Sequence, residues 1–294
     1  MLEGVVWVPQ YEVAGLIINI ESDTSRPLKL LSKFLLMQLC DADLNITIKA
    51  QDIIEAPEGS IVCADSYSIV KKKTSDYDHY FIYSTDLDGN IFILLDAERD
   101  WLNFVITYRK SLAEDAATLD YLLHSMIGVA FRYSFFNFDG LIIHSSTLKW
   151  NGKGLMFSAP SETGKSTHVR LWQRYLDDVI VLNDDTPAVR MINNKPYVFG
   201  TSWSGSKSIH SNDSAPLAAI VLLEQAPNNV IRRLTNHQEI ILKLLPRVFL
   251  PYFDQDMVKI FMDIFGEIMV SVPIYLLQCR PDKEAMELVY QCVK

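Results

Sequence analysis

The first hundred residues alternate short runs of β-branched and aromatic residues with polar breaks, a pattern typical of strands. The runs predict strands at Val13–Ile20, Asn45–Lys49, Tyr77–Ser84 and Asn90–Leu95. The residues Asp88 and Gly89 separate the last two runs, and this turn chemistry predicts a hairpin. We therefore expect residues 1–110 to form a small, mostly antiparallel, β-rich unit.

Two stretches of the first half carry apolar residues at helical spacing. One lies within Ser25–Cys40, and the other runs over Ala113–Phe131. The second stretch predicts a connecting helix, to which we assign residues 111–138. No repeat, low-complexity tract or Pro/Ser-rich linker separates the two halves of the chain.

From Leu141 onward, strands alternate with amphipathic helices, which predicts an α+β or α/β domain with a mixed sheet over residues 139–294. The strands are expected at Leu141–Trp150, Gly154–Ala159, Val179–Leu182, Lys195–Phe199, Ala218–Leu223 and Val272–Leu277. The helices are expected at Lys165–Tyr175, Gln238–Gly266, with breaks at Pro246 and Pro251, and Lys283–Val293. A continuous apolar run such as Ala218–Leu223 is typical of a strand covered on both faces.

Composition agrees with folded, globular units. The chain has 294 residues, of which 49% are hydrophobic and 11% aromatic, so it can bury a substantial core and is neither disordered nor fibrous. Its net charge of −9 disfavours nucleic acid and anionic membranes as partners.

The chain has four widely separated cysteines, Cys40, Cys63, Cys279 and Cys292. None has CxxC or zinc-ligand spacing, so we expect reduced, mostly buried thiols. The first residues lack the pattern of a secretory signal, and Glu267 and Pro273 interrupt the most apolar stretch. These features predict a cytoplasmic protein.

Residues Ala159–Ser166 (APSETGKS) fit a relaxed phosphate-loop pattern between a predicted strand and a predicted helix. In such a loop, backbone N–H groups face a phosphate, the lysine bridges phosphate oxygens and the hydroxyl binds Mg²⁺. The expected nucleotide-binding residues are Ser161, Glu162, Thr163, Gly164, Lys165, Ser166 and Thr167. The alternative is an ordinary helix start that Ser161 and Glu162 cap.

The next predicted strand ends in two carboxylates, Asp184 and Asp185, about twenty residues after the loop. One could hold Mg²⁺ while the other accepts a proton from an attacking hydroxyl. The alternative is an Asp-rich turn that Asn183 begins. His144, in the strand before the loop, reaches the same end of the sheet only if the register is right, and otherwise is a core residue.

Three other groups of basic residues admit two interpretations each. Lys207 follows a flexible polar loop around Trp203 and could meet a transferring phosphoryl group, or the loop lies on the surface. Arg232 and Arg233 are either a phosphate clamp or part of a solvated edge strand. The run Lys71–Lys73 is interpreted as a solvated turn, and the alternative is a surface that receives an acidic peptide.

Together, these residues resemble the catalytic domain of the HPr serine kinase/phosphorylase family, a relative of the ATP-dependent phosphoenolpyruvate carboxykinases. In that family, a strand carrying a histidine precedes a hairpin, a phosphate loop and, one helix and one strand later, an Asp-Asp pair. The matching positions here are His144, Asn151–Gly152, Ala159–Thr167, Asp184 and Asp185. The segment Gly200–Gly205 (GTSWSG) is similar to one in divergent members found among bacterial peptide-modification gene sets. The resemblance covers the chain from Gly140 onward and implies an HPr kinase-like P-loop domain behind a smaller β-rich unit.

The sequence departs from the family pattern at two loop positions. Ala159 stands where the family usually has glycine, and Thr167 stands where it usually has an acidic residue. The basic glycine-rich loop of the family has no counterpart. The resemblance therefore implies kinase chemistry but does not specify HPr as the substrate.

The function that this resemblance implies is an ATP- and Mg²⁺-dependent kinase. It would phosphorylate a hydroxyl, with serine of a peptide, small protein or small metabolite as the expected acceptor, as in peptide natural-product tailoring. Asp184 is the expected base, and Asp185 and Ser166 are the expected metal ligands, although the two aspartates could exchange roles. Lys165 and His144 would lie beside the reacting groups, and Lys207 would contact the nucleotide.

Two other functions stay open. One is a decarboxylating phosphotransfer like that of the carboxykinases, and the other is a non-catalytic nucleotide-binding module that senses ATP or recruits a partner. A peptide or small protein is the expected partner, and homo-oligomerisation stays open.

Overall fold

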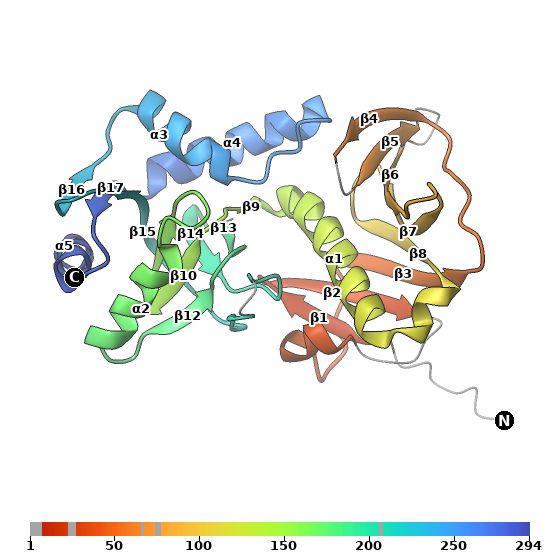
Figure 1. Cartoon of the computed structure of the whole chain (residues 1–294), viewed down its shortest axis with the longest axis horizontal. Coiled ribbons are helices and arrows are strands. Elements are labelled where there is room, and N and C mark those ends of the chain that lie inside the picture. Colours follow the sequence, from red (N-terminus) through yellow and green to blue (C-terminus); the bar gives the residue numbers. More distant parts are fainter. Residues whose placement is uncertain (1–7, 23–27, 66–67, 74–77, 206–207) are drawn as a thin grey trace. The chain divides into compact units, whose positions relative to one another are not determined.

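The chain folds into two compact units, residues 1–134 and 135–294, which are described separately (Figure 1). The structure is a computed structural model that describes residues 8–22, 28–65, 68–73, 78–205 and 208–294. Each unit contains a β-sheet with both parallel and antiparallel pairings, and helices accompany each sheet. The fold is therefore mixed α/β.

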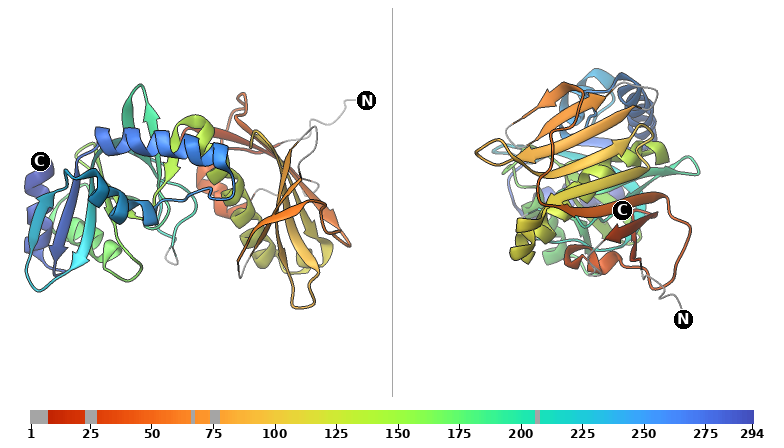
Figure 2. Two further views of the ribbon diagram at one scale, coloured as in Figure 1. Left: turned by 90° about the horizontal axis from the view of Figure 1, so that it is seen from above. Right: turned by 90° about the vertical axis from the view of Figure 1, so that its right-hand side faces the viewer.

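The first unit is built on an eight-stranded sheet with the order β1-β2-β3-β8-β7-β6-β5-β4. These strands are β1 (Gln10–Val13), β2 (Leu16–Ser22), β3 (Leu44–Gln51), β4 (Ser60–Ala64), β5 (Ile69–Lys73), β6 (His79–Thr85), β7 (Ile91–Glu98) and β8 (Asn103–Arg109). The strand β3 pairs in parallel with β2 and β8, and the other neighbours are antiparallel. In Figure 2 these strands, drawn red-orange to yellow, form one twisted sheet.

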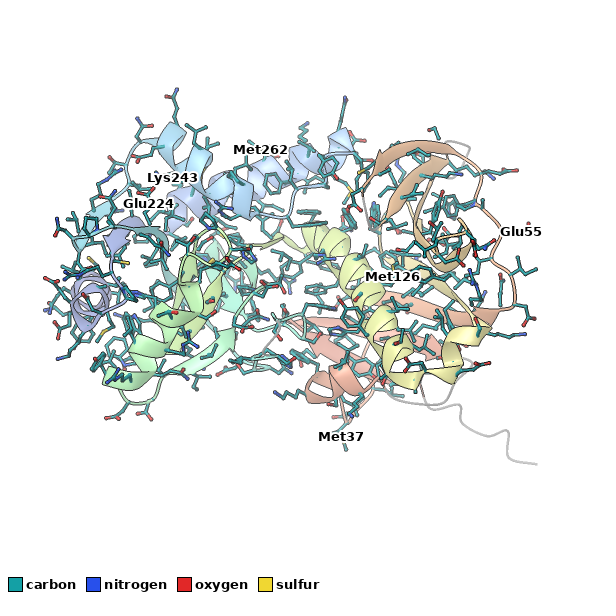
Figure 3. All side chains as sticks on the ribbon, in the orientation of Figure 1. Met37, Glu55, Met126, Glu224, Lys243 and Met262 are labelled. Carbon is teal, nitrogen blue, oxygen red and sulfur yellow. The ribbon has the colours of Figure 1, made fainter. Side chains whose placement is uncertain are left out.

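One long helix lies among the described residues of the first unit. The 3₁₀ helix η2 (Lys110–Glu114) leads into α1 (Ala116–Ser134), which contacts β7 and β8. The buried face of α1 has apolar residues at helical spacing, among them Leu123, Met126, Ile127, Ala130 and Phe131. Met126 is labelled in Figure 3. The spacing that predicted this helix therefore reflects a face packed on a sheet.

Three local predictions for this unit were wrong. The expected strand Val13–Ile20 is a hairpin, because Ala14 and Gly15 adopt positive φ angles of 54° and 74°. The expected helix within Ser25–Cys40 is, in its described part, the short 3₁₀ helix η1 (Lys29–Phe34). The run Lys71–Lys73 lies in strand β5 instead of a turn, and the Lys71 ammonium lies 5.9 Å from the centre of the Tyr83 ring.

The second unit is organised around one long strand, β15 (Ser214–Gln225). The other strands are β9 (Gly140–Ile142), β10 (Ser146–Trp150), β11 (Lys153–Ser158), β12 (Ile180–Asn183), β13 (Ala188–Ile192), β14 (Lys195–Phe199), β16 (Val230–Arg233) and β17 (Ile274–Cys279). The first residues of β15 pair with β14, and the rest lies between β11 and β17, parallel to both. Since β10 is antiparallel to β11 and β12, the strands β11, β12, β15 and β17 all end at the same edge of the sheet.

Helices α2 (Lys165–Tyr175) and α5 (Lys283–Val293) contact each other and cover one face of this sheet. Trp172 of α2 is fully buried there, together with alternate residues of β15 such as Val221. The Asp282 side chain caps α5 by accepting a hydrogen bond from the Ala285 N–H. These helices hold the strand ends, and the loops that follow them, in place.

The remaining helices described in this unit are the 3₁₀ helices η3 (Phe135–Phe138) and η4 (Leu245–Arg247), and the α-helices α3 (His237–Leu244) and α4 (Gln255–Ser271). The expected interruptions at Pro246 and Pro251 are present, because the chain leaves α3 through η4 and restarts at the Asp254 cap. The helix α4 contacts β9 and β14. None of the helices formed by the described residues has the length and apolar character to cross a membrane.

Two further predictions need correction. The expected strand Leu141–Trp150 breaks into β9 and β10, because the His144 N–H donates to the Arg247 carbonyl and the Ser145 N–H donates to the Asp185 carbonyl. The cysteines are free thiols as expected, but they are not mostly buried, since Cys40 and Cys292 are exposed.

Two glycines, Gly200 and Gly266, differ in the space around them and allow a matched test of backbone packing. A Cβ at Gly200 would lie 1.9 Å from the Ser211 carbonyl oxygen and 2.5 Å from the Leu182 carbonyl oxygen, whereas a Cβ at Gly266 in α4 meets no described atom within 4 Å. We expect Gly200→Ala to lower the free energy of unfolding by about 2 kcal/mol or more, because backbone must move. Gly266→Ala should raise it by about 0.5–1 kcal/mol through helix propensity. Urea denaturation measures both, and equal midpoints for the two variants would contradict the packing described for Gly200.

Candidate functional site

The segment Ala159–Ser166 connects β11 to α2, as the phosphate-loop pattern requires. Glu162 and Gly164 have positive φ angles of 63° and 112°, which give the loop its tight curvature. The Lys165 ammonium reaches back over the loop and donates to the carbonyls of Ala159 at 3.1 Å and Pro160 at 3.3 Å. The loop thus holds the one buried lysine side chain of the described core against its own backbone.

The two carboxylates lie at the end of β12, on the same edge of the sheet. A carboxylate oxygen of Asp184 accepts a hydrogen bond from the Gly205 N–H at 3.1 Å. A carboxylate oxygen of Asp185 lies 3.1 Å from Nδ1 of His144. The break between β9 and β10 therefore brings His144 to Asp185, which the sequence predicted only as one of two alternatives.

A buried serine connects the phosphate loop to the carboxylates. The Ser146 hydroxyl, at the start of β10, lies 3.3 Å from the Ser166 hydroxyl and donates to the Asp184 carbonyl at 3.2 Å. Ser146 is fully buried. This hydroxyl fixes the separation between the loop and the Asp184–Asp185 turn, and no sequence motif identified it.

Asn183 organises the turn that carries both aspartates. Its side-chain oxygen accepts hydrogen bonds from the Asp185 and Thr186 N–H groups, each at 2.8 Å. Its side-chain nitrogen donates to the carbonyls of Thr201 and Trp203, both at 3.0 Å. Asn183, which suggested an ordinary turn, therefore also links the turn to the Gly200–Gly205 segment through hydrogen bonds.

The Gly200–Gly205 segment is held by further hydrogen bonds. The Thr201 hydroxyl donates to the Thr186 carbonyl at 2.8 Å, and the Ser204 hydroxyl lies 3.0 Å from Nδ1 of His210. The segment is thus hydrogen-bonded to the turn that carries Asp184 and Asp185. Lys207, which we expected to contact the nucleotide, lies outside the described residues.

Two charged side chains, Asp185 and Arg247, act on the Lys165 ammonium in opposite directions. Burial is the main cause that lowers the pKa of Lys165, the nearby Asp185 carboxylate partly opposes this, and the Arg247 guanidinium lowers the pKa further. Arg247 lies in η4, and its carbonyl also accepts from the His144 N–H at 2.7 Å. Sequence analysis missed this arginine because only the position of η4 in the fold brings it to the loop.

Two cavities adjoin the phosphate loop. The larger has a volume of about 590 Å³, and its lining includes Glu162, Thr163, Gly164, Thr167, His168, Leu223, Gln225, Ala226, Cys279, Arg280 and Pro281. The smaller, of about 220 Å³, borders Ser158, Pro160 and Arg247. The ion pair between Lys243 and Glu224 also borders the smaller cavity, and Figure 3 labels the two residues beside one another.

The arginine pair predicted as either a phosphate clamp or an edge strand lies in β16, which pairs with β17. Both side chains are exposed, and Arg232 forms an ion pair with Glu239. The edge-strand interpretation is therefore the one that the structure supports.

The expected metal ligands fit Mg²⁺ by their chemistry. Hydroxyl and carboxylate oxygens, here from Ser166 and Asp185, are the hard ligands that Mg²⁺ takes in small number, with phosphate and water completing the shell. Among the described residues, no group of three His, Cys, Asp or Glu side chains gathers to form an all-protein metal cage.

Comparisons with known proteins include a distant structural neighbour. No protein-family model matches the chain, and no curated protein matches it. Among solved structures, it is similar to the HPr(Ser) kinase/phosphatase from Coxiella burnetii, with a TM-score of 0.31 and 14% sequence identity, over 52% of this chain and 87% of that chain. A similarity of this size does not assign a function, so the function below is argued from the residues of this chain.

The buried His168, in the first turn of α2, yields a stability prediction. Burial lowers the pKa of His168 from 6.5 to about 4, so the unfolded chain binds its proton at a higher pH than the folded protein does. This residue should therefore destabilise the protein as the pH falls from about 6.5 toward 4, by roughly 2 kcal/mol between pH 7 and pH 4.5. We expect His168→Phe to lose that much less stability than the wild type over this range. Urea denaturation at both pH values measures the difference, and parallel losses in the two proteins would show that His168 does not titrate in this way.

Proposed function

We propose that this protein is an ATP- and Mg²⁺-dependent kinase that transfers the γ-phosphoryl group to a hydroxyl, with serine of a peptide, small protein or small metabolite as the acceptor. The observation that carries the proposal is the hydrogen-bond link through Ser146 between the loop residue Ser166 and the turn of Asp184 and Asp185. A phosphate-binding loop and an acceptor-facing carboxylate must lie within one site for phosphoryl transfer. Such a link is not needed by a helix cap or by an isolated Asp-rich turn.

Phosphate binding would fall to the loop. Its backbone N–H groups and the start of α2 favour an anion, and the Lys165 ammonium supplies a charge. Because Lys165 now donates to two loop carbonyls, binding would exchange these acceptors for phosphate oxygens. Arg247 adds a second positive charge near the same point.

The Ser166 hydroxyl and the Asp185 carboxylate would hold Mg²⁺. When bound, the ion would offset charge on the β- and γ-phosphates and help orient them. His144, at 3.1 Å from Asp185, would fix the orientation of that carboxylate.

Asp184 would act as the base. The acceptor O–H gives its proton to a carboxylate oxygen of Asp184, and the acceptor oxygen forms a bond to the γ-phosphorus. The bond from the γ-phosphorus to the β,γ-bridging oxygen breaks, its electron pair stays on the ADP oxygen, and Asp184 later releases the proton to water. The hydrogen bond from the Gly205 N–H orients Asp184, so catalysis would depend mostly on positioning and electrostatics.

The direct test is transfer of labelled γ-phosphate to a panel of serine-containing peptides and to free serine, with Mg²⁺. We expect a labelled acceptor with the wild type and a large loss with Lys165→Ala, because ATP binding weakens while the fold is kept. Circular dichroism and the melting temperature control for folding.

A wild type that neither binds nor turns over ATP would rule out the kinase. Tight ATP binding without transfer, unchanged in Asp184→Asn, would instead support a non-catalytic module, and ADP formation that needs oxaloacetate would support the carboxykinase alternative.

The two carboxylates should respond differently to amide substitution. Asp184→Asn removes a base and should lower the maximal rate by roughly 10²–10⁴-fold with little change in Mg²⁺ requirement. The loss could fall at the low end of this range, because a loose transition state needs little early proton removal. Asp185→Asn removes a metal ligand and should raise the Mg²⁺ concentration needed for half-maximal rate. Rates measured over a Mg²⁺ titration decide the assignment, since identical defects would contradict the division of roles and reversed defects would exchange them.

A further inference from the structure

The larger cavity lies on a definite side of the phosphate loop. It borders the end of β15 at Gln225 and the residues after β17, Arg280 and Pro281. The carboxylates, in contrast, follow β12. In the strand order β12-β10-β11-β15-β17, the loop leaves β11 and therefore lies between the carboxylates and the cavity.

This order gives a bound nucleotide a direction. A triphosphate on the loop must turn its γ-phosphate toward Asp184 and Asp185, where the base and the metal ligands lie. Its α-phosphate, and the sugar attached to it, must then point toward β15 and β17. The cavity begins at that point, because Thr163 and Gly164 of the loop and Thr167 at the start of α2 line it.

The size and lining of the cavity suit a nucleoside. Its volume of about 590 Å³ lies within the range of small-molecule sites. Leu223, Ala226 and Pro281 offer apolar contact for a flat base, and the exposed Gln225 side chain offers an amide at the rim. A mostly apolar wall with few polar groups is the usual way to hold and orient such a ring.

His168 adds an unmet hydrogen-bonding group to this wall. The residue is 3% exposed and lines the cavity, and its Nε2 has no hydrogen-bond partner among the described residues. The ring packs on Phe157, with centroids 4.6 Å apart. A buried polar atom of this kind calls for a partner, and a heteroatom of a bound base would supply one after a small adjustment.

From this arrangement we infer that the cavity between the phosphate loop and the ends of β15 and β17 binds the nucleoside of ATP, with the base against Ala226 and hydrogen-bonded to His168. This inference rests on the proposed function for the placement of the phosphates. It adds the part of the site that distinguishes ATP from inorganic polyphosphate. His168 and Ala226 are thereby binding residues, separate from the groups that act on the γ-phosphate.

The test compares MgATP with magnesium tripolyphosphate, since tripolyphosphate presents the phosphates without a nucleoside. Isothermal titration calorimetry on the full chain gives both dissociation constants for the wild type, Ala226→Trp and His168→Phe. Ala226→Trp fills the cavity, and His168→Phe keeps an aromatic ring but removes Nε2. The control is Val270→Trp, which introduces the same side chain at an exposed position of α4.

We expect the wild type to bind ATP at least about tenfold more tightly than tripolyphosphate, because the nucleoside adds buried contacts. Ala226→Trp should abolish this advantage, and His168→Phe should weaken ATP binding about three- to tenfold, the size of one hydrogen bond. Both variants, and the control, should bind tripolyphosphate as the wild type does.

The outcomes separate this inference from the proposed function. If the wild type binds ATP but its advantage over tripolyphosphate persists in Ala226→Trp and His168→Phe, the nucleoside lies elsewhere while the kinase proposal stands. If the wild type binds neither ligand, the proposed function fails and this inference fails with it. Should Ala226→Trp not fold, His168→Phe decides alone, because unchanged ATP affinity in that variant contradicts the hydrogen bond to the base.

Discussion

The site depends first on the hydrogen bonds of one fully buried side chain, Asn183. Its amide accepts two backbone N–H groups from the turn of the aspartates and donates to carbonyls of the Gly200–Gly205 segment. Only an amide side chain offers donors and an acceptor in this geometry, and an unsatisfied buried backbone group costs about 1–3 kcal/mol. Replacing this residue would therefore release two segments at once. The position of both carboxylates follows from a buried polar network and not from the aspartates themselves.

Strand direction supplies the second constraint. Because β11, β12, β15 and β17 run the same way, the segments that follow them meet at one edge, and a site there draws on residues far apart in sequence. The order of the strands also separates tasks along this edge, with carboxylates on one side of the phosphate loop and an apolar cavity on the other. A change of register in β10 would move Ser146, which links Ser166 to the turn of Asp184 and Asp185.

The sequence predicted those parts of the fold and site that local chemistry determines. The helix at Lys165–Tyr175 and the strand that ends before the Asp pair depend on neighbouring residues, and both elements lie where expected. The break between β9 and β10 could not be predicted, because it is made by carbonyls of Asp185 and Arg247, which are distant in sequence. For the same reason Ser146 and Arg247 were missed. The hairpin at Ala14 was missed because a non-glycine residue adopts positive φ there, which apolar periodicity does not reveal.

Asp185 and Arg247 affect the loop through the charge of Lys165. Two carbonyls accept hydrogen bonds from the Lys165 ammonium but do not neutralise its charge. Burial, together with Arg247, lowers the pKa of Lys165 although Asp185 is near. A buried ammonium in this state gains more from an added anion than a solvated one would, because the surrounding medium screens it less. The loop amides and Arg247 act in the same direction. The fold thus brings the two positive charges of Lys165 and Arg247 to the loop that lies between the carboxylates and the cavity.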